Sequence, residues 1–113
     1  MQISRKKLCS PSVQVAQVVE EIIGCKWSIS VIGCVRSGVM RPGAMQHSIP
    51  GISAKVLNQR LRRFLTFGIL EKSVFQEKPY HVEYKLTEFG QRFIRVLDVV
   101  DELQYYVDSR TAA

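Results

Sequence analysis

The chain has 113 residues, of which 46% are hydrophobic, and it carries a formal net charge of +6 at pH 7. This length is enough for one hydrophobic core and one domain, but not for two. No apolar run approaches the eighteen or more residues of a membrane span, and the basic N-terminus lacks the apolar stretch of a signal peptide. We therefore expect a cytoplasmic protein with no membrane partner.

The charge is distributed unevenly along the sequence. Residues 26–70 contain seven Lys and Arg and no Asp or Glu, whereas residues 87–113 contain three cations and five acids. Such segregation predicts one face that is suited to a polyanion. A solvated basic surface without a partner is the alternative. We favour nucleic acid, because the cations coincide with the best candidate for a base-reading helix.

Two helices are predicted before residue 40. Ser10 or Ser12 can cap the first, whose apolar positions lie within residues 15–23, and a glycine ends it. The second covers approximately residues 26–37. It contains Gly33, which costs about 1 kcal/mol relative to alanine inside a helix, so we expect a packing reason for this glycine.

A short third helix is predicted from Arg41 to His47, and Ile49-Pro50-Gly51 then makes a tight turn into residues 51–68. This segment reads GISAKVLNQRLRRFLTFG, and at 100° per residue its apolar and polar residues separate onto two faces. The apolar arc consists of Leu57, Leu61, Phe64 and Leu65. The residues predicted to point away from it are Lys55, Gln59, Arg62 and Arg63, with Asn58 and Arg60 on the flanks.

The polar face of this helix has the chemistry of a DNA-reading surface. It holds four cations and no acid, and its amide and guanidinium groups can hydrogen-bond phosphates and base edges in a major groove. A helix, a short turn and a basic helix form a helix-turn-helix. The candidate contacts are Lys55, Gln59 and Arg62 at base edges, Ser53 and Asn58 at bases or phosphates, and Arg60 and Arg63 at phosphates.

After Gly68 the hydrophobic period changes from 3.6 to 2, which predicts two strands. The first covers approximately residues 69–75, and the second, HVEYKL, covers residues 81–86. Two strands after a basic helix indicate a wing, in which Lys78, His81 and Lys85 would reach a minor groove or the DNA backbone. The predicted fold class is α+β, a winged helix-turn-helix with a two- or three-stranded wing.

Thr87 is predicted to cap a long last helix, from about residue 88 to 108. The spacing of Val96, Val100, Leu103 and Val107 is typical of a helix–helix seam. This helix is more apolar than a small domain can cover, and the simplest cover is its copy in a second subunit. The alternative is that the helix folds back on its own core.

Three other functional classes compete with DNA binding. A winged helix can serve as a protein-interaction module, which would bind DNA weakly and without sequence preference. RNA binding is less favoured because the aromatic residues occupy core positions rather than an open stacking platform. An enzyme is not indicated, since we find no paired carboxylates, nucleophile constellation or phosphate-binding glycine loop. Nor does the sequence indicate a cofactor, a metal site or a particular small-molecule effector.

The chain resembles the HxlR-type winged-helix transcriptional regulators, which are relatives of the MarR group. The matching segments follow the family order over about two thirds of the chain. They are Gly24-Cys25-Lys26-Trp27, Ile49-Pro50-Gly51-Ile52-Ser53, Lys55-Val56-Leu57, Gln59-Arg60-Leu61, Gly68-Ile69-Leu70 and Val82-Glu83-Tyr84-Lys85-Leu86-Thr87-Glu88-Phe89-Gly90.

The resemblance implies one winged-helix domain over residues 1–113, with a flexible basic tail at 1–12 and a dimerisation helix at 87–109. It implies a homodimer built from the first and last helices, which binds an inverted-repeat operator in double-stranded DNA. The helix at residues 53–67 would enter the major groove, with the wing at 72–84 beside it. The regulator would repress or activate nearby genes.

The resemblance also raises the possibility of redox sensing, because several relatives sense oxidants or electrophiles through an N-terminal cysteine. Here Gln14-Val15 occupies that place, and the nearest candidate is Cys9, five residues upstream. Nearby cations and a following helix N-terminus would favour its thiolate. Cys25 and Cys34 would lie about 13 Å apart along one helix, too far to bridge within a subunit, and a disulfide between subunits stays open.

Overall fold

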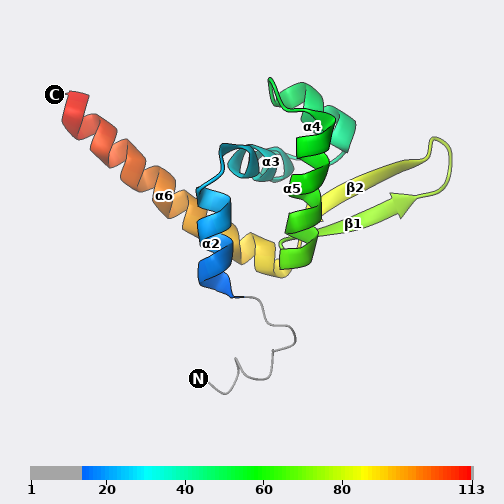
Figure 1. Cartoon of the computed structure of the whole chain (residues 1–113), viewed down its shortest axis with the longest axis horizontal. Helices are drawn as coiled ribbons and strands as arrows, with labels where there is room; N and C mark the ends of the chain where they lie inside the picture. Colours follow the sequence, from blue (N-terminus) through cyan, green and yellow to red (C-terminus); the bar gives the residue numbers. More distant parts are fainter. Residues whose placement is uncertain (1–13, 113) are drawn as a thin grey trace, which may run out of the picture.

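The computed structural model describes residues 14–112, and within them the chain forms five α-helices and a two-stranded antiparallel sheet (Figure 1). The elements are α2 (Val15–Ile23), α3 (Lys26–Arg36), α4 (Pro42–Ser48), α5 (Ala54–Phe67), β1 (Leu70–Phe75), β2 (His81–Leu86) and α6 (Glu88–Ala112). Both the order and the type of these elements confirm the predicted winged helix-turn-helix, with a two-stranded wing and a long C-terminal helix.

The core lies where α2, α3 and α5 meet. From α2, Val18 and Ile22 are fully buried, four residues apart on one face of the helix. The apolar arc of α5 is buried as predicted at Leu57, Leu61 and Phe64. Complete burial of such a side chain contributes about 1.5–3 kcal/mol, so these few residues dominate the free energy that seats α5.

The expectation of a packing reason for Gly33 in α3 is wrong. Apart from its chain neighbours and the backbone of α3 itself, a Cβ atom added at Gly33 would meet no atom within 4 Å, so Gly33 lies on an open side of the helix. A glycine that does require its small size occurs in α6 instead. A Cβ on Gly90 would clash with the carbonyl oxygen of Ile69, which lies where α5 leads into β1.

The helix-turn-helix depends on a tight turn between α4 and α5. Gly51 adopts a φ of 87°, a left-handed conformation that glycine tolerates without steric cost. On either side of it, Ile49 and Ile52 are buried and hold the turn against the core. In α4, Pro42 occupies the first turn and Met45 is fully buried.

The wing is fastened to the helices at its base. β1 and β2 pair in register from Leu70 opposite Leu86 to Phe75 opposite His81. The backbone N–H of Tyr84 in β2 donates to the carbonyl of Met40, between α3 and α4, at 2.9 Å. From this base the wing extends away from the helices (Figure 1).

Helix α6 changes character along its length. Its first half contributes Phe93 and Leu97 to the core, and Thr87 caps it by accepting a hydrogen bond from the Gly90 N–H at 2.9 Å. Residues 101–110 are exposed, and this half projects beyond the other helices (Figure 1). Within residues 14–112, no helix combines the length and the apolar character that a membrane span needs.

Candidate nucleic-acid interface

The second helix of the helix-turn-helix, α5, has defined ends that fix how it presents its side chains. Ser53 is the N-cap, and its hydroxyl accepts a hydrogen bond from the Val56 N–H at 3.1 Å. Such a cap stabilises a helix by about 1 kcal/mol. At the other end, Gly68 adopts a φ of 78° and closes the helix. Ser53, a candidate DNA contact, therefore has a structural role in addition to any contact with DNA.

Four of the candidate contacts lie together on the outward face of α5. Lys55, Asn58, Gln59 and Arg62 are all exposed, and their spacing places them on one side of the helix. They combine two cations with two carboxamides, the mixture that can bind phosphates and also hydrogen-bond base edges. We name these four residues the reading face.

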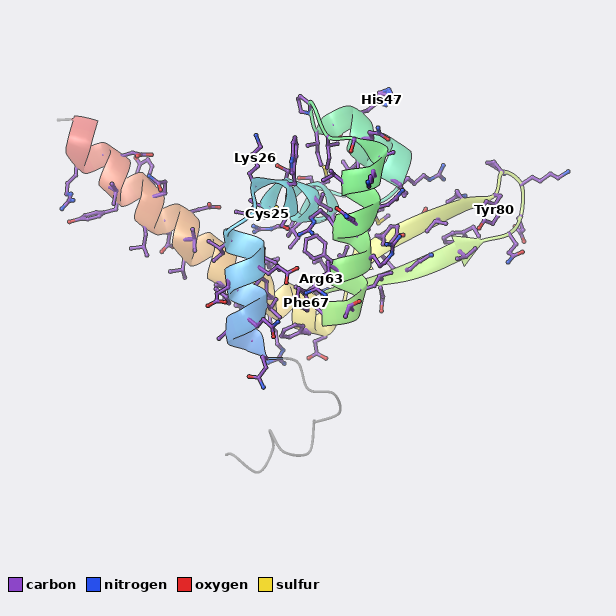
Figure 2. The ribbon with its side chains drawn as sticks, in the orientation of Figure 1. Cys25, Lys26, His47, Arg63, Phe67 and Tyr80 are labelled. Carbon is purple, nitrogen blue, oxygen red and sulfur yellow. The ribbon has the colours of Figure 1, made fainter. Side chains whose placement is uncertain are left out.

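Arg60 and Arg63 lie elsewhere, on the side of α5 that meets α2 and α3. Figure 2 shows Arg63 on the side of α5 that faces α2. Arg63 donates to both carboxylate oxygens of Glu21 in α2, at 2.7 Å from Nε and 2.6 Å from Nη2. Arg60 donates to the hydroxyl of Ser28 in α3 at 3.3 Å. The predicted outward orientation of Arg63 therefore differs from the structure, whereas Arg60 does lie on a flank.

Phe67, the last residue of α5, lies on the same side of the helix as these two arginines. It is buried with 8% of its surface exposed, although the predicted apolar arc did not include it. At 100° per residue Phe67 lies about 80° from Leu57, on the side of Arg60. The buried arc of α5 is therefore wider than predicted on this side. The Arg63 guanidinium also packs over the Phe67 ring, 4.7 Å from its centroid.

Folding also brings carboxylates to cations that are isolated from acids in the sequence. Besides Arg63 with Glu21, Arg36 pairs with Asp98 of α6 at 2.9 Å. The hydrogen bond from Arg63 lowers the pKa of Glu21 against the effect of burial, which raises it, and the same bond raises the pKa of Arg63. Folding therefore neutralises part of the positive charge of residues 26–70, at Arg36 and Arg63, and leaves Lys55 and Arg62 exposed on the reading face.

In the wing, the three candidate contacts are placed differently. Lys78 and Lys85 are exposed. His81 is partly buried, and its ring stacks on Phe75 with the centroids 4.6 Å apart. Its Nδ1 lies 3.0 Å from the Pro79 carbonyl oxygen. The wing therefore offers its lysines to a partner, whereas His81 lies within contacts of the hairpin itself.

Of the three cysteines, Cys9 lies outside the described residues, whereas Cys25 and Cys34 lie within them. Burial raises the pKa of Cys34. Partial burial also raises the pKa of Cys25, but hydrogen bonds from the backbone and hydroxyl of Ser28 and from the Trp27 backbone, together with the Arg60 charge, outweigh it and lower the pKa overall. Cys25 is partly buried and Cys34 is buried, as expected of cysteines whose main role is to fill space.

Comparison with known proteins agrees with this architecture. Residues 22–111 match the HxlR-like helix-turn-helix family. The chain belongs to this family. Over 87 residues it is 38% identical to sll1512 of Synechocystis, named as an uncharacterized HTH-type transcriptional regulator. That match covers 77% of the chain and 64% of the relative, less than two thirds of the relative's own length.

Solved structures of regulators have the same fold. A protein from Enterococcus faecalis assigned to the MarR family of transcriptional regulators superimposes with a TM-score of 0.77 at 26% identity, covering 87% of this chain and 89% of that one. Diamide-treated YodB from B. subtilis gives a TM-score of 0.66 at 30% identity, covering 82% and 89%. The chain is therefore similar in sequence and in fold to helix-turn-helix transcriptional regulators.

Proposed function

We propose that this HxlR-like protein is a dimeric regulator that binds double-stranded DNA sequence-specifically, through the reading face of α5. The observation that carries the proposal is the exposure of Lys55, Asn58, Gln59 and Arg62 on the second helix of a helix-turn-helix. In this motif the second helix lies in the major groove, where carboxamides and guanidinium groups discriminate base pairs. Lys78 and Lys85 in the wing would add phosphate contacts.

The dimer is supported by the projecting half of α6. Leu103 is 60% exposed and Tyr106 is 59% exposed, and Val99 is also exposed on this half of the helix. Large apolar side chains gathered on one exposed element indicate an interaction surface. A second copy of the chain would cover them, and a two-fold dimer would present two reading helices to an inverted repeat, with half-sites about 34–36 Å apart.

The experiment is a fluorescence-anisotropy titration of the protein with the DNA upstream of its own gene and with a scrambled control, under reducing conditions and at two salt concentrations. We expect binding to the upstream DNA that is at least a hundredfold tighter, a threshold below the specificity ratio of roughly 10³–10⁷ that is typical of DNA-binding regulators. Gln59→Ala should weaken specific binding by about tenfold, because one base-reading pair contributes about 1–3 kcal/mol. Gln91→Ala, an exposed glutamine of α6, is the matched control.

The competing hypothesis is a protein-interaction module. It would give equally weak binding to both DNA molecules despite a stable dimer, and Gln59→Ala would then have no effect on either. A salt dependence that is the same for both sequences would identify the remaining binding as contact with phosphates alone.

Redox sensing through Cys9 is a second candidate function. It is supported by the similarity to YodB, whose structure was solved after treatment with diamide, a thiol oxidant. Oxidant should change the affinity of the wild type for its operator and should leave the Cys9→Ser protein unaffected. An equal response of both proteins would assign the effect to Cys25 or Cys34, and no response would remove redox sensing from the proposed function.

A further inference from the structure

The pair formed by Arg63 and Glu21 joins the reading helix to α2. Both carboxylate oxygens accept hydrogen bonds, at 2.6 and 2.7 Å, and the guanidinium lies over the Phe67 ring. A two-point pairing of this kind fixes direction as well as distance, because the planar guanidinium matches the planar carboxylate. Arg63 is thus held in one orientation by a contact to α2 and a contact within α5.

A second contact lies one helical turn away on the same side of α5. Arg60 reaches the hydroxyl of Ser28, a fully buried residue of α3. Two arginines, three residues apart in sequence, therefore hold this side of α5 against α2 and α3. The reading face lies on another side of the same helix, and its direction depends on how α5 is held about its own axis.

We propose that Arg63 is a positioning residue for DNA recognition: through Glu21 it fixes the orientation of the reading face relative to α2. This inference rests on the proposed function. Hydrogen bonds to base edges require a geometry within a few tenths of an ångström, so a small rotation of α5 would weaken specific binding while phosphate contacts survive.

The same geometry disfavours a direct phosphate contact by Arg63. Its Nε and one terminal nitrogen already donate to Glu21, and the pair is electrically neutral as a whole. A phosphate at Arg63 would have to approach the Glu21 carboxylate, which repels it. A neutral pair releases no counterions from DNA, so it should add nothing to the salt dependence of binding.

The two roles for Arg63 predict opposite effects of Glu21→Gln. If Arg63 is a positioning residue, loss of the carboxylate charge loosens α5, and specific affinity falls about five- to tenfold while binding to scrambled DNA stays the same. If Arg63 contacts phosphate, Glu21→Gln releases the guanidinium and strengthens binding to every sequence. Arg63→Gln should lower specific affinity to a similar degree, with an unchanged slope of log K against log salt.

A charge exchange completes the test. The double variant Glu21→Arg, Arg63→Glu rebuilds the ion pair with reversed polarity and the same net charge, and it should regain most of the specific affinity lost in Glu21→Gln. Arg95→Gln, which removes an exposed cation of α6, is the matched control for net charge. Thermal melting of each variant identifies any loss of the fold, and the conservative Glu21→Gln decides the question if the exchange does not fold.

The inference is overturned if Glu21→Gln tightens binding to both DNA molecules, or if Arg63→Gln reduces the salt slope by about one, the value for one lost phosphate contact. It is also overturned if the charge exchange binds no better than Arg63→Gln. Failure of the proposed function would be recognised separately, because the wild type would then show no preference for its upstream DNA. In that case the Arg63–Glu21 pair would have no role in DNA recognition either.

Discussion

Helices α5 and α6 are both amphipathic, but the apolar side chains of α5 are covered within the chain to a much greater extent. Leu57, Leu61 and Phe64 are at most 2% exposed, and Leu65 is partly buried against the core. In α6, Phe93 and Leu97 are buried whereas Leu103 is 60% exposed. The difference separates a helix that belongs to the core from one whose second half leaves large apolar side chains exposed.

This comparison teaches that hydrophobic periodicity predicts a buried face without saying what buries it. For α5 the neighbouring helices supply the cover. For the second half of α6 the same type of pattern points away from the core, and a second copy is our proposal for its cover. Substitutions on the two helices should therefore have different consequences, one for folding and the other for association.

The largest effect is expected in α5. Phe64→Ala removes a fully buried ring and should destabilise the protein by about 3–5 kcal/mol, much of the 5–15 kcal/mol that stabilises a typical domain. Urea unfolding followed by circular dichroism measures the change. A loss below 1 kcal/mol would show that the site collapses around the cavity and that the cover of α5 is less tight than its burial suggests.

A charge in the exposed half of α6 should break the dimer and spare the fold. Leu103→Asp places a carboxylate on the proposed seam in both subunits, and we expect the dissociation constant of the dimer to rise about a hundredfold, or roughly 3 kcal/mol. Sedimentation velocity at several concentrations measures it. Gln91→Asp adds the same charge at an exposed position near the start of α6. Equal dimer affinities in the two variants would contradict the proposed seam.

At the start of α6, the stability of the fold should depend on the volume of the side chain at residue 90 rather than on charge. Gly90→Ala introduces a methyl group against the Ile69 carbonyl and should destabilise the fold by about 1–3 kcal/mol. Gly33→Ala is the matched helical glycine, with open space around it, and it should instead stabilise the protein by about 1 kcal/mol. A lower melting temperature for Gly90→Ala and a higher one for Gly33→Ala would confirm the two predictions. A Gly90→Ala protein as stable as the wild type would contradict the close packing of α6 against the end of α5.

The sequence predicted the elements closely, because their signals are local. The Thr87 cap, the glycines and the change of hydrophobic period placed most helices and strands near their observed bounds. The predicted cap of the first helix was wrong, because α2 has Gln14 as its N-cap, without a side-chain hydrogen bond, rather than Ser10 or Ser12. The reading face was predicted in the same way, since Lys55, Gln59 and Arg62 are separated from the apolar arc by helical geometry alone. These predictions need only the spacing of residues within one segment.

What the sequence could not predict depends on contacts between distant segments. Glu21 precedes Arg63 by 42 residues, and nothing in either segment indicates that α2 lies beside α5. The run of cations without acids from residue 26 to 70 suggested a more basic surface than the fold retains, because carboxylates at both Glu21 and Asp98 come from outside that run. Only Phe67 carried a local signal, as an apolar residue on the side of Arg60.

The smallest expected effect is the pH dependence contributed by Glu21, whose hydrogen bond to Arg63 lowers its pKa despite partial burial. Because the folded state has the lower pKa, the pair stabilises the fold above the pKa of the unfolded chain, and this stabilisation is lost as the pH falls through the folded value. The effect should be modest, since water reaches both side chains. Glu21→Gln should therefore be less stable than wild type at pH 7, and in urea unfolding the difference should shrink as the pH falls through the lowered pKa of Glu21. The exposed Glu102→Gln of α6 should follow the wild type over the same pH range, and a difference for Glu21→Gln that stays constant throughout the acid range would mean that packing, not the ion pair, joins α5 to α2.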